Sequence, residues 1–275
     1  MRVRGIDVSS YQGKIDWERV KPYIDFAIIR CGYGNNLKSQ DDIYFERNAE
    51  YCKKLNIPFG VYLYSYATNL DEARSEVEHT LRLIKDKKLE YPVYLDVENR
   101  RQMALRQEEL TDIVDYYASE MEKAGYYVGI YASVDRFRGI LSSARLNYDK
   151  WVAEWGDKLT YDNEKVGLWQ HTAYEEMPGI RTRVDGDYAL KDYPKIIRDL
   201  GLNHLEEKRK YKVGDIVYIS GEIYTDYNAE KIKDRVCDRK VEITKVDEND
   251  VKAPYQIDHS EEWIKEEDIF IKCDR

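Results

Sequence analysis

Residues 91–98 read YPVYLDVE, and this stretch decides the fold prediction because it joins a buried strand to two carboxylates. Its first residues are apolar or aromatic, with a proline at the entry, which is typical of a strand covered on both faces. Asp96 and Glu98 occupy alternate positions at its far end. Alternate side chains on a strand point the same way, with Cα atoms about 6–7 Å apart, so we expect the two carboxylates to project together.

Strand-like and helix-like segments alternate through the first part of the chain. Apolar runs at residues 26–34 and 58–67 are each followed by a segment with helical spacing, at 41–56 and 69–88. Repeated strand–helix units imply a parallel sheet with both faces covered. The helical segments shorten beyond residue 133. About eight strands in roughly 200 residues predict an irregular TIM-like β/α barrel, with about five strand–helix units followed by short strands.

A change of pattern near residue 205 divides the chain. Segments 212–221, 240–247 and 269–273 alternate apolar and polar residues, with turn residues between them, which is typical of strands. We therefore expect a barrel domain at residues 1–204, a linker at 205–210 and a small all-β domain at 211–275. About 65 residues is close to the lower limit for a domain that folds alone.

The composition narrows the choice of partners. A formal net charge of −9 argues against nucleic acid, because phosphate binding needs a basic surface. No run of about 18 apolar residues occurs, so we expect no membrane insertion. The N-terminus, MRVRGIDVSSYQ, has no apolar segment of the kind found in signal peptides, so we expect a protein made as a cytoplasmic chain. None of the 4 cysteines has zinc-ligand spacing, and we expect no cofactor.

Further acidic residues fall at the ends of other predicted strands. Asp7 closes the first strand, in GIDVSS, and Asp185 and Asp187 close the last one, in RVDGDY. The first and last strands of a closed barrel are neighbours, and the carboxyl ends of barrel strands carry active sites. These acids should therefore meet Asp96 and Glu98 at one mouth. Such a group fits glycoside hydrolysis by paired carboxyls, or a carboxylate site for Mg²⁺ or Ca²⁺.

Aromatic residues favour a sugar cleft over a metal site. The chain has 25 tyrosines against 5 phenylalanines, and a tyrosine ring combines a flat apolar face with a polar tip. A metal–phosphate site would instead need lysine, arginine or glycine-rich loops. Core packing is the alternative explanation for each ring. The aromatic residues at or near the carboxyl ends of predicted strands are Tyr33, Tyr62, Tyr64, Tyr66, Tyr131, Trp155 and Trp169.

Eight sequence blocks, taken in order, resemble those of one family. They are GIDVSSYQGKIDW, RCGYG, FGVYLYSYA, YPVYLDVE, GIYAS, WVAEWG, LWQHT and VDGDY. Together they cover roughly residues 3–200 and are similar to glycoside hydrolase family 25, the muramidase-type lysozymes. The resemblance implies an irregular β/α barrel that cleaves the β-1,4 bond from N-acetylmuramic acid to N-acetylglucosamine in peptidoglycan.

The resemblance also implies roles for individual residues. Glu98 corresponds to the catalytic acid of the family and Asp96 to its assisting carboxylate, while Asp7 and Asp185 correspond to two flanking acids. Asp187 falls where the family often has Asn or Asp, and we rank it below Asp185. Many members have histidine where this chain has Tyr64, which affects the detail of sugar binding rather than the chemistry. The residues expected to bind the sugar are Tyr33, Tyr62, Tyr64, Tyr131, Trp155, Gln170 and Asp187.

Two mechanisms are open for such a site. In both, Glu98 protonates the glycosidic oxygen and positive charge develops on the muramic sugar. In the first, the 2-acetamido oxygen of that sugar attacks, oriented by Asp96. In the second, a water directed by Asp7 or Asp185 attacks and inverts the anomeric centre.

Residues 211–272 resemble a bacterial SH3-like wall-binding module, through the opening YKVGDIV and the closing EEWIKEEDI. Bacterial peptidoglycan is the expected partner of the chain, and the sequence leaves open which part of the wall the second domain binds. A wall-cutting enzyme without a signal peptide fits a phage endolysin, which stays in the cytoplasm until a holin-type partner releases it. A bacterial autolysin with another export route is the alternative.

Three other functions compete with this interpretation. A decayed barrel would bind the wall without cutting it, although retention of Asp7, Asp96, Glu98 and Asp185 argues against this. A metal-dependent phosphodiesterase would use the same acids. A chitinase is the nearest enzymatic alternative, but the DxxDxDxE run typical of chitinases is absent.

Overall fold

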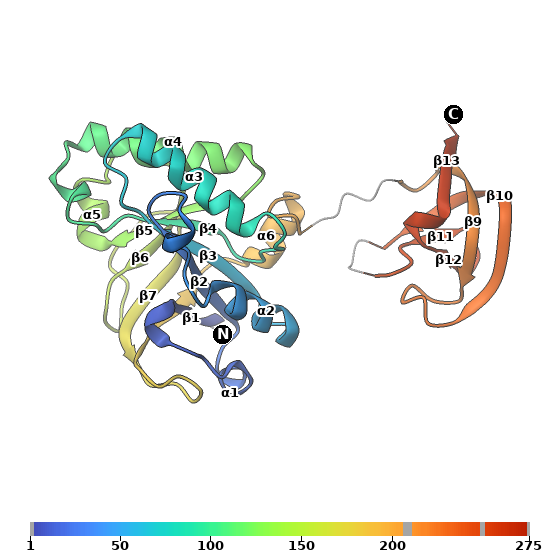
Figure 1. Cartoon of the computed structure of the whole chain (residues 1–275), viewed down its shortest axis with the longest axis horizontal. Coiled ribbons are helices and arrows are strands. Elements are labelled where there is room, and N and C mark those ends of the chain that lie inside the picture. Colours follow the sequence, from blue (N-terminus) through green and yellow to red (C-terminus); the bar gives the residue numbers. More distant parts are fainter. Residues whose placement is uncertain (1–2, 206–210, 248–250, 274–275) are drawn as a thin grey trace. The chain divides into compact units, whose positions relative to one another are not determined.

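The computed structural model describes residues 3–205, 211–247 and 251–273 (Figure 1). The chain forms two compact units, residues 1–205 and 206–275. The expected first domain ended at residue 204, and residues 206–210 of the expected linker lie outside the described residues. Within the described ranges, no helix is both long enough and apolar enough to cross a membrane.

Eight strands close the first unit into a barrel, in which each strand pairs with the next one along the chain and the last pairs with the first. This confirms the expected β/α barrel. The strands are β1 (Val3–Val8), β2 (Phe26–Tyr33), β3 (Phe59–Tyr64), β4 (Val93–Asp96), β5 (Val128–Ser133), β6 (Asp149–Ala153), β7 (Val166–Glu175) and β8 (Val184–Ala189).

Strand β8 runs in the opposite direction to its neighbours. The pairings from β1 to β7 are parallel, whereas β8 is antiparallel to both β7 and β1. The prediction that Asp185 and Asp187 close the last strand is wrong, because Asp185 is the second residue of β8 and the strand continues past Asp187 to Ala189. The start of an antiparallel strand lies beside the end of its neighbour, and Asp185 is directly opposite Asp7. Because β8 is antiparallel to β1, Asp185 lies at the expected edge of the barrel.

Six α-helices connect or follow the strands of the barrel, and α3 and α4 lie side by side outside it (Figure 1). Local signals set their ends: the Asn69 side chain accepts a bond from the backbone N–H of Glu72 at the start of α3, and Asn56 takes a left-handed φ of 51° after α2. The helices are α1 (Trp17–Val20), α2 (Phe45–Leu55), α3 (Leu70–Ile84), α4 (Gln107–Lys123), α5 (Val134–Arg138) and α6 (Tyr193–Asp199). Short 3₁₀ helices occur at Ser10–Gln12, Lys21–Tyr23, Lys38–Gln40 and Gln102–Ala104.

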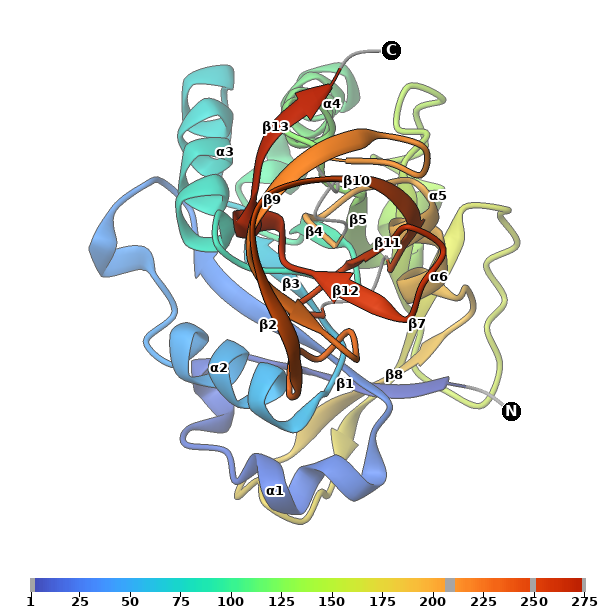
Figure 2. The same ribbon diagram turned by 90° about the vertical axis from the view of Figure 1, so that its right-hand side faces the viewer.

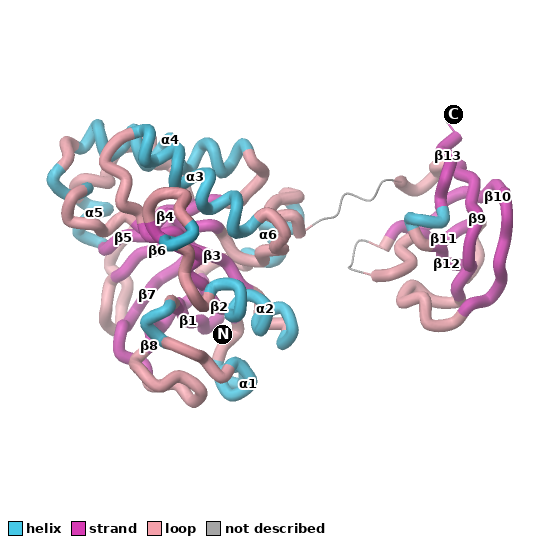
Figure 3. Tube along the Cα trace, in the orientation of Figure 1, coloured by secondary structure: helices cyan, strands magenta, loops and turns pink. Residues whose placement is uncertain are grey.

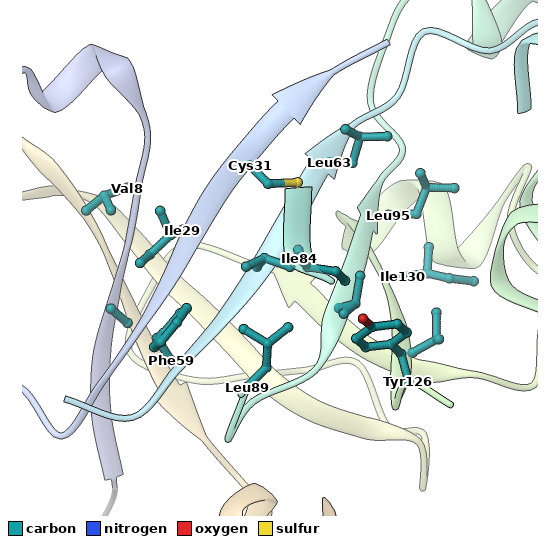
Figure 4. Close-up of a cluster of buried hydrophobic side chains, with 14 of the residues drawn as sticks. Val8, Ile29, Cys31, Phe59, Leu63, Ile84, Leu89, Leu95, Tyr126 and Ile130 are labelled. Atoms are coloured by element: carbon teal, nitrogen blue, oxygen red, sulfur yellow. The ribbon is translucent and has the colours of Figure 1, made fainter. Parts of the chain in front are cut away.

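Successive side chains of a barrel strand point to opposite faces of the sheet and therefore pack into two different clusters. Leu95 of β4 belongs to the aliphatic cluster that also contains Ile84 of α3, outside the barrel wall (Figure 4). Tyr94, one position earlier, belongs instead to an aromatic cluster with Trp151 of β6. Asp96 follows Tyr94 by the strand period of two, so it faces the inside of the barrel. A buried strand can end in a carboxylate here because the inside of the barrel opens at this end.

The second unit is all-β, and its strands pair antiparallel (Figures 2 and 3). Strand β9 pairs with β10, β12 and β13, which folds the sheet around a small core that includes Val217, Ile243 and Ile257. The strands are β9 (Ile216–Tyr224), β10 (Ile232–Val246), β11 (Tyr255–Ile257), β12 (Glu262–Ile264) and β13 (Ile269–Cys273), with a 3₁₀ helix at Glu266–Asp268.

Candidate active site

A cleft of about 620 Å³ lies at the carboxyl ends of the parallel strands. The acidic residues that line it are Asp7, Asp96, Glu98 and Asp185. They come from β1, from β4 and the segment after it, and from β8. The structure therefore brings together the acids that the sequence predicted to meet.

Asp96 and Glu98 differ strongly in their exposure to solvent. Asp96 is 4% exposed, and its Oδ1 has no hydrogen-bond partner among the described residues. Burial, and then the charge of Glu98, raise the pKa of Asp96 well above its usual value. The Glu98 side chain is 38% exposed. Asp96, rather than Glu98, is thus the member of the pair that burial drives more strongly toward the neutral form.

Arg136 of α5 contacts both the carboxyl group and the backbone carbonyl of Glu98. Its Nη1 lies 3.7 Å from Glu98 Oε2, and its Nη2 donates a hydrogen bond of 3.1 Å to the Glu98 carbonyl. Burial raises the pKa of Glu98, and the Arg136 guanidinium opposes that rise. The hydrogen bond to the Glu98 carbonyl fixes the segment after β4, while the ion pair lowers the pKa of the Glu98 carboxyl group.

A second acidic group lies between β1 and β8. Burial, and then the charges of Asp187 and Asp185, raise the pKa of Asp7. Burial also raises the pKa of Asp185 to about 6. Gln170 Nε2 donates a 2.9 Å hydrogen bond to Asp7 Oδ2, which lowers the pKa of Asp7 and partly offsets the other effects.

Asp187 lies beneath this group and not on the cleft wall. Its side chain is 0% exposed, and its Oδ1 accepts a 2.7 Å hydrogen bond from the Trp151 indole. The predicted role of Asp187 in contacting the sugar is not supported by this geometry. The residue instead orients Trp151, whose ring forms part of the cleft lining.

The predicted aromatic residues fall into two groups. Tyr33, Tyr62, Tyr64 and Tyr131 line the cleft, as does Gln170, which accepts a 3.0 Å bond from the Tyr131 hydroxyl. Trp155 lies beside the cleft rather than in its lining. It is 57% exposed, and its indole N–H donates a 3.1 Å bond to Gln170 Oε1.

Sequence reasoning missed Arg30, which lines the cleft from β2. Its Nε donates to Asp42 Oδ2 at 2.9 Å, its Nη2 donates to Ser10 Oγ at 2.7 Å, and the Tyr11 ring lies 5.2 Å from the guanidinium carbon. The signal was present in FAIIRCGYG, where one cation interrupts a buried strand on the face opposite Ile29 and Cys31. Tyr66, one of the aromatic residues expected at the strand ends, also lines the cleft. The other missed lining residues are Ser9, Ser10, Tyr11, Gln12 and Trp151.

Helix α3 anchors two loops of the cleft rim from behind. Glu76 is 1% exposed and accepts bonds from Ser65 Oγ at 2.7 Å and from the backbone N–H groups of Tyr66 and Ala67 at 2.6 and 3.0 Å. Gln102, in the segment after Glu98, donates to the same Ser65 hydroxyl at 2.7 Å. The network joins the loop after β3 to the loop after β4.

His79, one turn further along α3, fixes another loop of the cleft rim to the helix. Its ring nitrogens lie 2.9 Å from the Gly34 carbonyl and 2.9 Å from Asp41 Oδ1, and Asp41 also pairs with Arg82. The loop after β2 is thereby fixed to the helix. Among the described residues, no three His, Cys, Asp or Glu side chains are grouped so as to hold a metal ion.

Comparison with known protein families identifies the family to which this chain belongs. Residues 6–180 match the family described as Glycosyl hydrolases family 25. The chain belongs to this family. The match includes Asp7, Asp96 and Glu98, and it ends before Asp185. Family membership makes the barrel a glycoside hydrolase domain and agrees with the resemblance carried by the sequence blocks.

Individual relatives cover mainly the barrel. The uncharacterized protein YegX of Escherichia coli (strain K12) is 29% identical over 192 residues, covering 66% of this chain and 68% of YegX. The autolytic lysozyme of Clostridium acetobutylicum is 25% identical over 187 residues, covering 67% of this chain and 55% of the lysozyme. The modular autolysin LytC from Streptococcus pneumoniae, solved with a synthetic peptidoglycan ligand, superposes with a TM-score of 0.62 and 30% identity. That superposition covers 68% of this chain but only 46% of LytC.

Proposed function

We propose that this chain is a peptidoglycan hydrolase that cleaves the β-1,4 bond between N-acetylmuramic acid and N-acetylglucosamine. The observation that carries the proposal is the pairing of a half-exposed Glu98 with a buried Asp96 at a cleft whose other walls are tyrosines and further acids. Membership of glycosyl hydrolases family 25, and relatives named as an autolytic lysozyme and an autolysin, support the same substrate.

Glu98 is the general acid in this proposal. Its carboxyl faces the cleft, so it can reach the oxygen of a bound glycosidic bond, and a substrate that displaces water strengthens the tendency of Glu98 to hold its proton. As that proton moves to the leaving oxygen, positive charge grows on the muramic sugar. Asp96 lies behind Glu98 at the end of β4, where its carboxyl group can hydrogen-bond to the 2-acetamido group and orient it.

Asp7 and Asp185 supply the alternative route for the second step. They lie opposite each other on β1 and β8 and line the same cleft, so either could direct a water to the anomeric carbon. Attack by the acetamide retains the anomeric configuration of the first product, and attack by this water inverts it. Proton NMR of the first product formed from a defined oligosaccharide distinguishes the two routes.

We also propose that the second unit is an SH3-like module that binds the bacterial wall. Two linked modules raise the effective concentration of the catalytic unit on an insoluble polymer. Residues 211–272 carry the sequence resemblance, and their antiparallel strands are compatible with it. An endolysin role, with the chain held in the cytoplasm until a holin-type partner releases it, stays a prediction.

Replacement of Glu98 tests the proposal. Glu98→Gln keeps the shape of the side chain but removes the transferable proton, so hydrolysis of purified peptidoglycan should fall by about 10²–10⁴-fold. Glu108→Gln, on an exposed position of α4, is the matched control and should digest the wall like the unaltered chain. Near-normal lysis by Glu98→Gln contradicts the assignment. Lack of lysis by the unaltered chain favours a non-catalytic wall-binding protein, and loss of activity in EDTA favours a metal-dependent phosphodiesterase.

A further inference from the structure

An aromatic and basic surface continues outward from the cleft on the side of β6 and β7. Trp155, after β6, is 57% exposed, and Tyr174, near the end of β7, is 59% exposed. Their ring centroids are 5.8 Å apart, and the ring planes meet at 79°. Two exposed aromatic rings in contact with each other form a contiguous apolar surface beside the cleft, and exposed apolar surfaces of this kind are often binding sites.

This surface is connected to the catalytic acids by hydrogen bonds. The Trp155 indole donates to Gln170 Oε1 at 3.1 Å, and Gln170 Nε2 donates to Asp7 Oδ2 at 2.9 Å. A ring face presented by Trp155 is therefore held in a defined position relative to Asp7. A sugar that packs on that face would belong to the same polymer that enters the cleft.

Arg183 adds a positive charge to this surface. Its guanidinium carbon lies 5.4 Å from the centroid of the Tyr174 ring, and its carbonyl accepts a 3.3 Å bond from Gln12 Nε2, a residue of the cleft lining. The ring contact and the backbone bond restrict the side chain while leaving it exposed to solvent.

The charge of Arg183 is available to a ligand. Arg30, another cation near the acids, is already paired with Asp42 at 2.8 Å. Arg183 forms no ion pair with any residue that the structure describes. An anionic group on a substrate would be repelled by the acids of the cleft floor and attracted to Arg183, so this surface suits a sugar that carries an anion on one side.

We propose that Trp155, Tyr174 and Arg183 form a subsite for a muramic acid residue that still bears its stem peptide. The sugar packs on the exposed face of Trp155. A carboxylate of the peptide bonds to the Arg183 guanidinium, which Tyr174 holds in place. This subsite rests on the proposed function, because it assigns the part of peptidoglycan that lies outside the bond being cut. It makes the enzyme prefer glycan strands with peptides over bare strands.

The test compares two substrates made from the same material. One is a preparation of uncrosslinked glycan strands with intact stem peptides, from which other wall polymers have been removed. The other is the same preparation after an amidase has removed the peptides and the lactyl carboxylates that this cleavage frees have been converted to methylamides, so that the bare strands carry no anion on the muramic sugar. The kcat/KM ratio of the two substrates is measured for the unaltered chain, for Arg183→Ala and for Arg181→Ala. Arg181→Ala removes the same charge from the same loop, two residues away, and is the matched control.

The unaltered chain should prefer the peptide-bearing strands by about fivefold, mainly through KM, because an exposed charge contributes to ground-state binding. Arg183→Ala should lose this preference and cut bare strands as before, while Arg181→Ala should retain it. High salt should weaken the preference of the unaltered chain, since it screens an exposed charge. Trp155→Ala should raise KM for both substrates.

An unchanged ratio in Arg183→Ala, or an equal loss in both arginine variants, overturns the subsite while leaving the proposed function intact. Absence of new reducing ends from either substrate with the unaltered chain overturns the proposed function itself. Thermal unfolding of each variant at the unaltered temperature establishes that a changed ratio does not come from misfolding.

Discussion

Gln170 Nε2 donates a 2.9 Å hydrogen bond to Asp7 Oδ2, although the two residues lie 163 positions apart in the chain. The carbonyl oxygen of the same amide accepts bonds from the Tyr131 hydroxyl and from the Trp155 indole. Because the two donors occupy the oxygen, the amide nitrogen has to face Asp7. One side chain thereby links the acid on β1 to the aromatic residues of β5 and the segment after β6.

Replacement of Gln170 should disturb the acid limb of the pH profile. Gln170→Glu replaces a donor by a second carboxylate beside Asp7, which raises the pKa of Asp7 further. If Asp7 acts in its ionised form, the acid limb of kcat/KM moves to higher pH. Gln170→Ala removes the donor without adding charge and should give a smaller shift in the same direction. An acid limb that stays at its original pH in both variants would show that Asp7 does not act as an ionised group.

Removal of Arg136 should extend activity to higher pH. The guanidinium opposes the rise in the pKa of Glu98, so Arg136→Gln lets that pKa rise further. A general acid is active while protonated, and its activity is lost as the pH rises through its pKa. The alkaline limb of kcat/KM should therefore move upward in Arg136→Gln. Arg136→Lys keeps the charge and should leave that limb close to its original position. A downward shift in Arg136→Gln would be incompatible with Glu98 as the acid.

The barrel, and the convergence of the acidic residues at one end of it, could both be predicted from the sequence. Asp96 could be placed because strand alternation is local and the buried apolar run of β4 ends there. Glu98 lies beyond the end of β4, in the segment that follows it, and still lines the cleft as expected. The direction of β8 could not be predicted, because the sequence of Val184–Ala189 is compatible with a parallel and with an antiparallel strand. Asp185 reached the predicted mouth through the opposite strand direction.

Long-range partners set the rest of the site. Whether Asp187 faces a sugar or an indole depends on Trp151, which lies two strands away in the barrel. Neither Arg136, which pairs with Glu98, nor Arg30 belongs to a local motif that identifies it as a cleft residue. The relative burial of Asp96 and Glu98, which decides which carboxyl favours its proton more strongly, also depends on packing between segments distant in sequence.

Glu76 should make the stability of the barrel depend on pH. Burial raises the pKa of Glu76 from 4.5 to about 7, despite the hydrogen bond from Ser65 that lowers it. Because the folded-state pKa is the higher one, the contribution of this group to stability is fully present below pH 4.5 and is lost as the pH rises through about 7. That loss amounts to roughly 3 kcal/mol in the free energy of unfolding.

Glu76→Gln removes this titration while approximating the protonated side chain. Urea unfolding should give similar free energies for the variant and the unaltered chain at about pH 4, and a more stable variant at about pH 8. Glu78→Gln, an exposed carboxylate on the same helix, is the control and should follow the unaltered chain at both values. An equal difference between Glu76→Gln and the unaltered chain at both pH values would show that Glu76 does not titrate with folding.

The central claim is that the convergent acids cut the glycan on the reducing side of muramic acid. It is tested most directly by digesting purified peptidoglycan, reducing the new ends with borohydride and analysing the fragments by mass spectrometry. Cleavage at this bond by Glu98 gives reduced muramic acid at the new ends with the unaltered chain and none with Glu98→Gln. Reduced glucosamine at those ends, or released peptides without new reducing sugars, would contradict it.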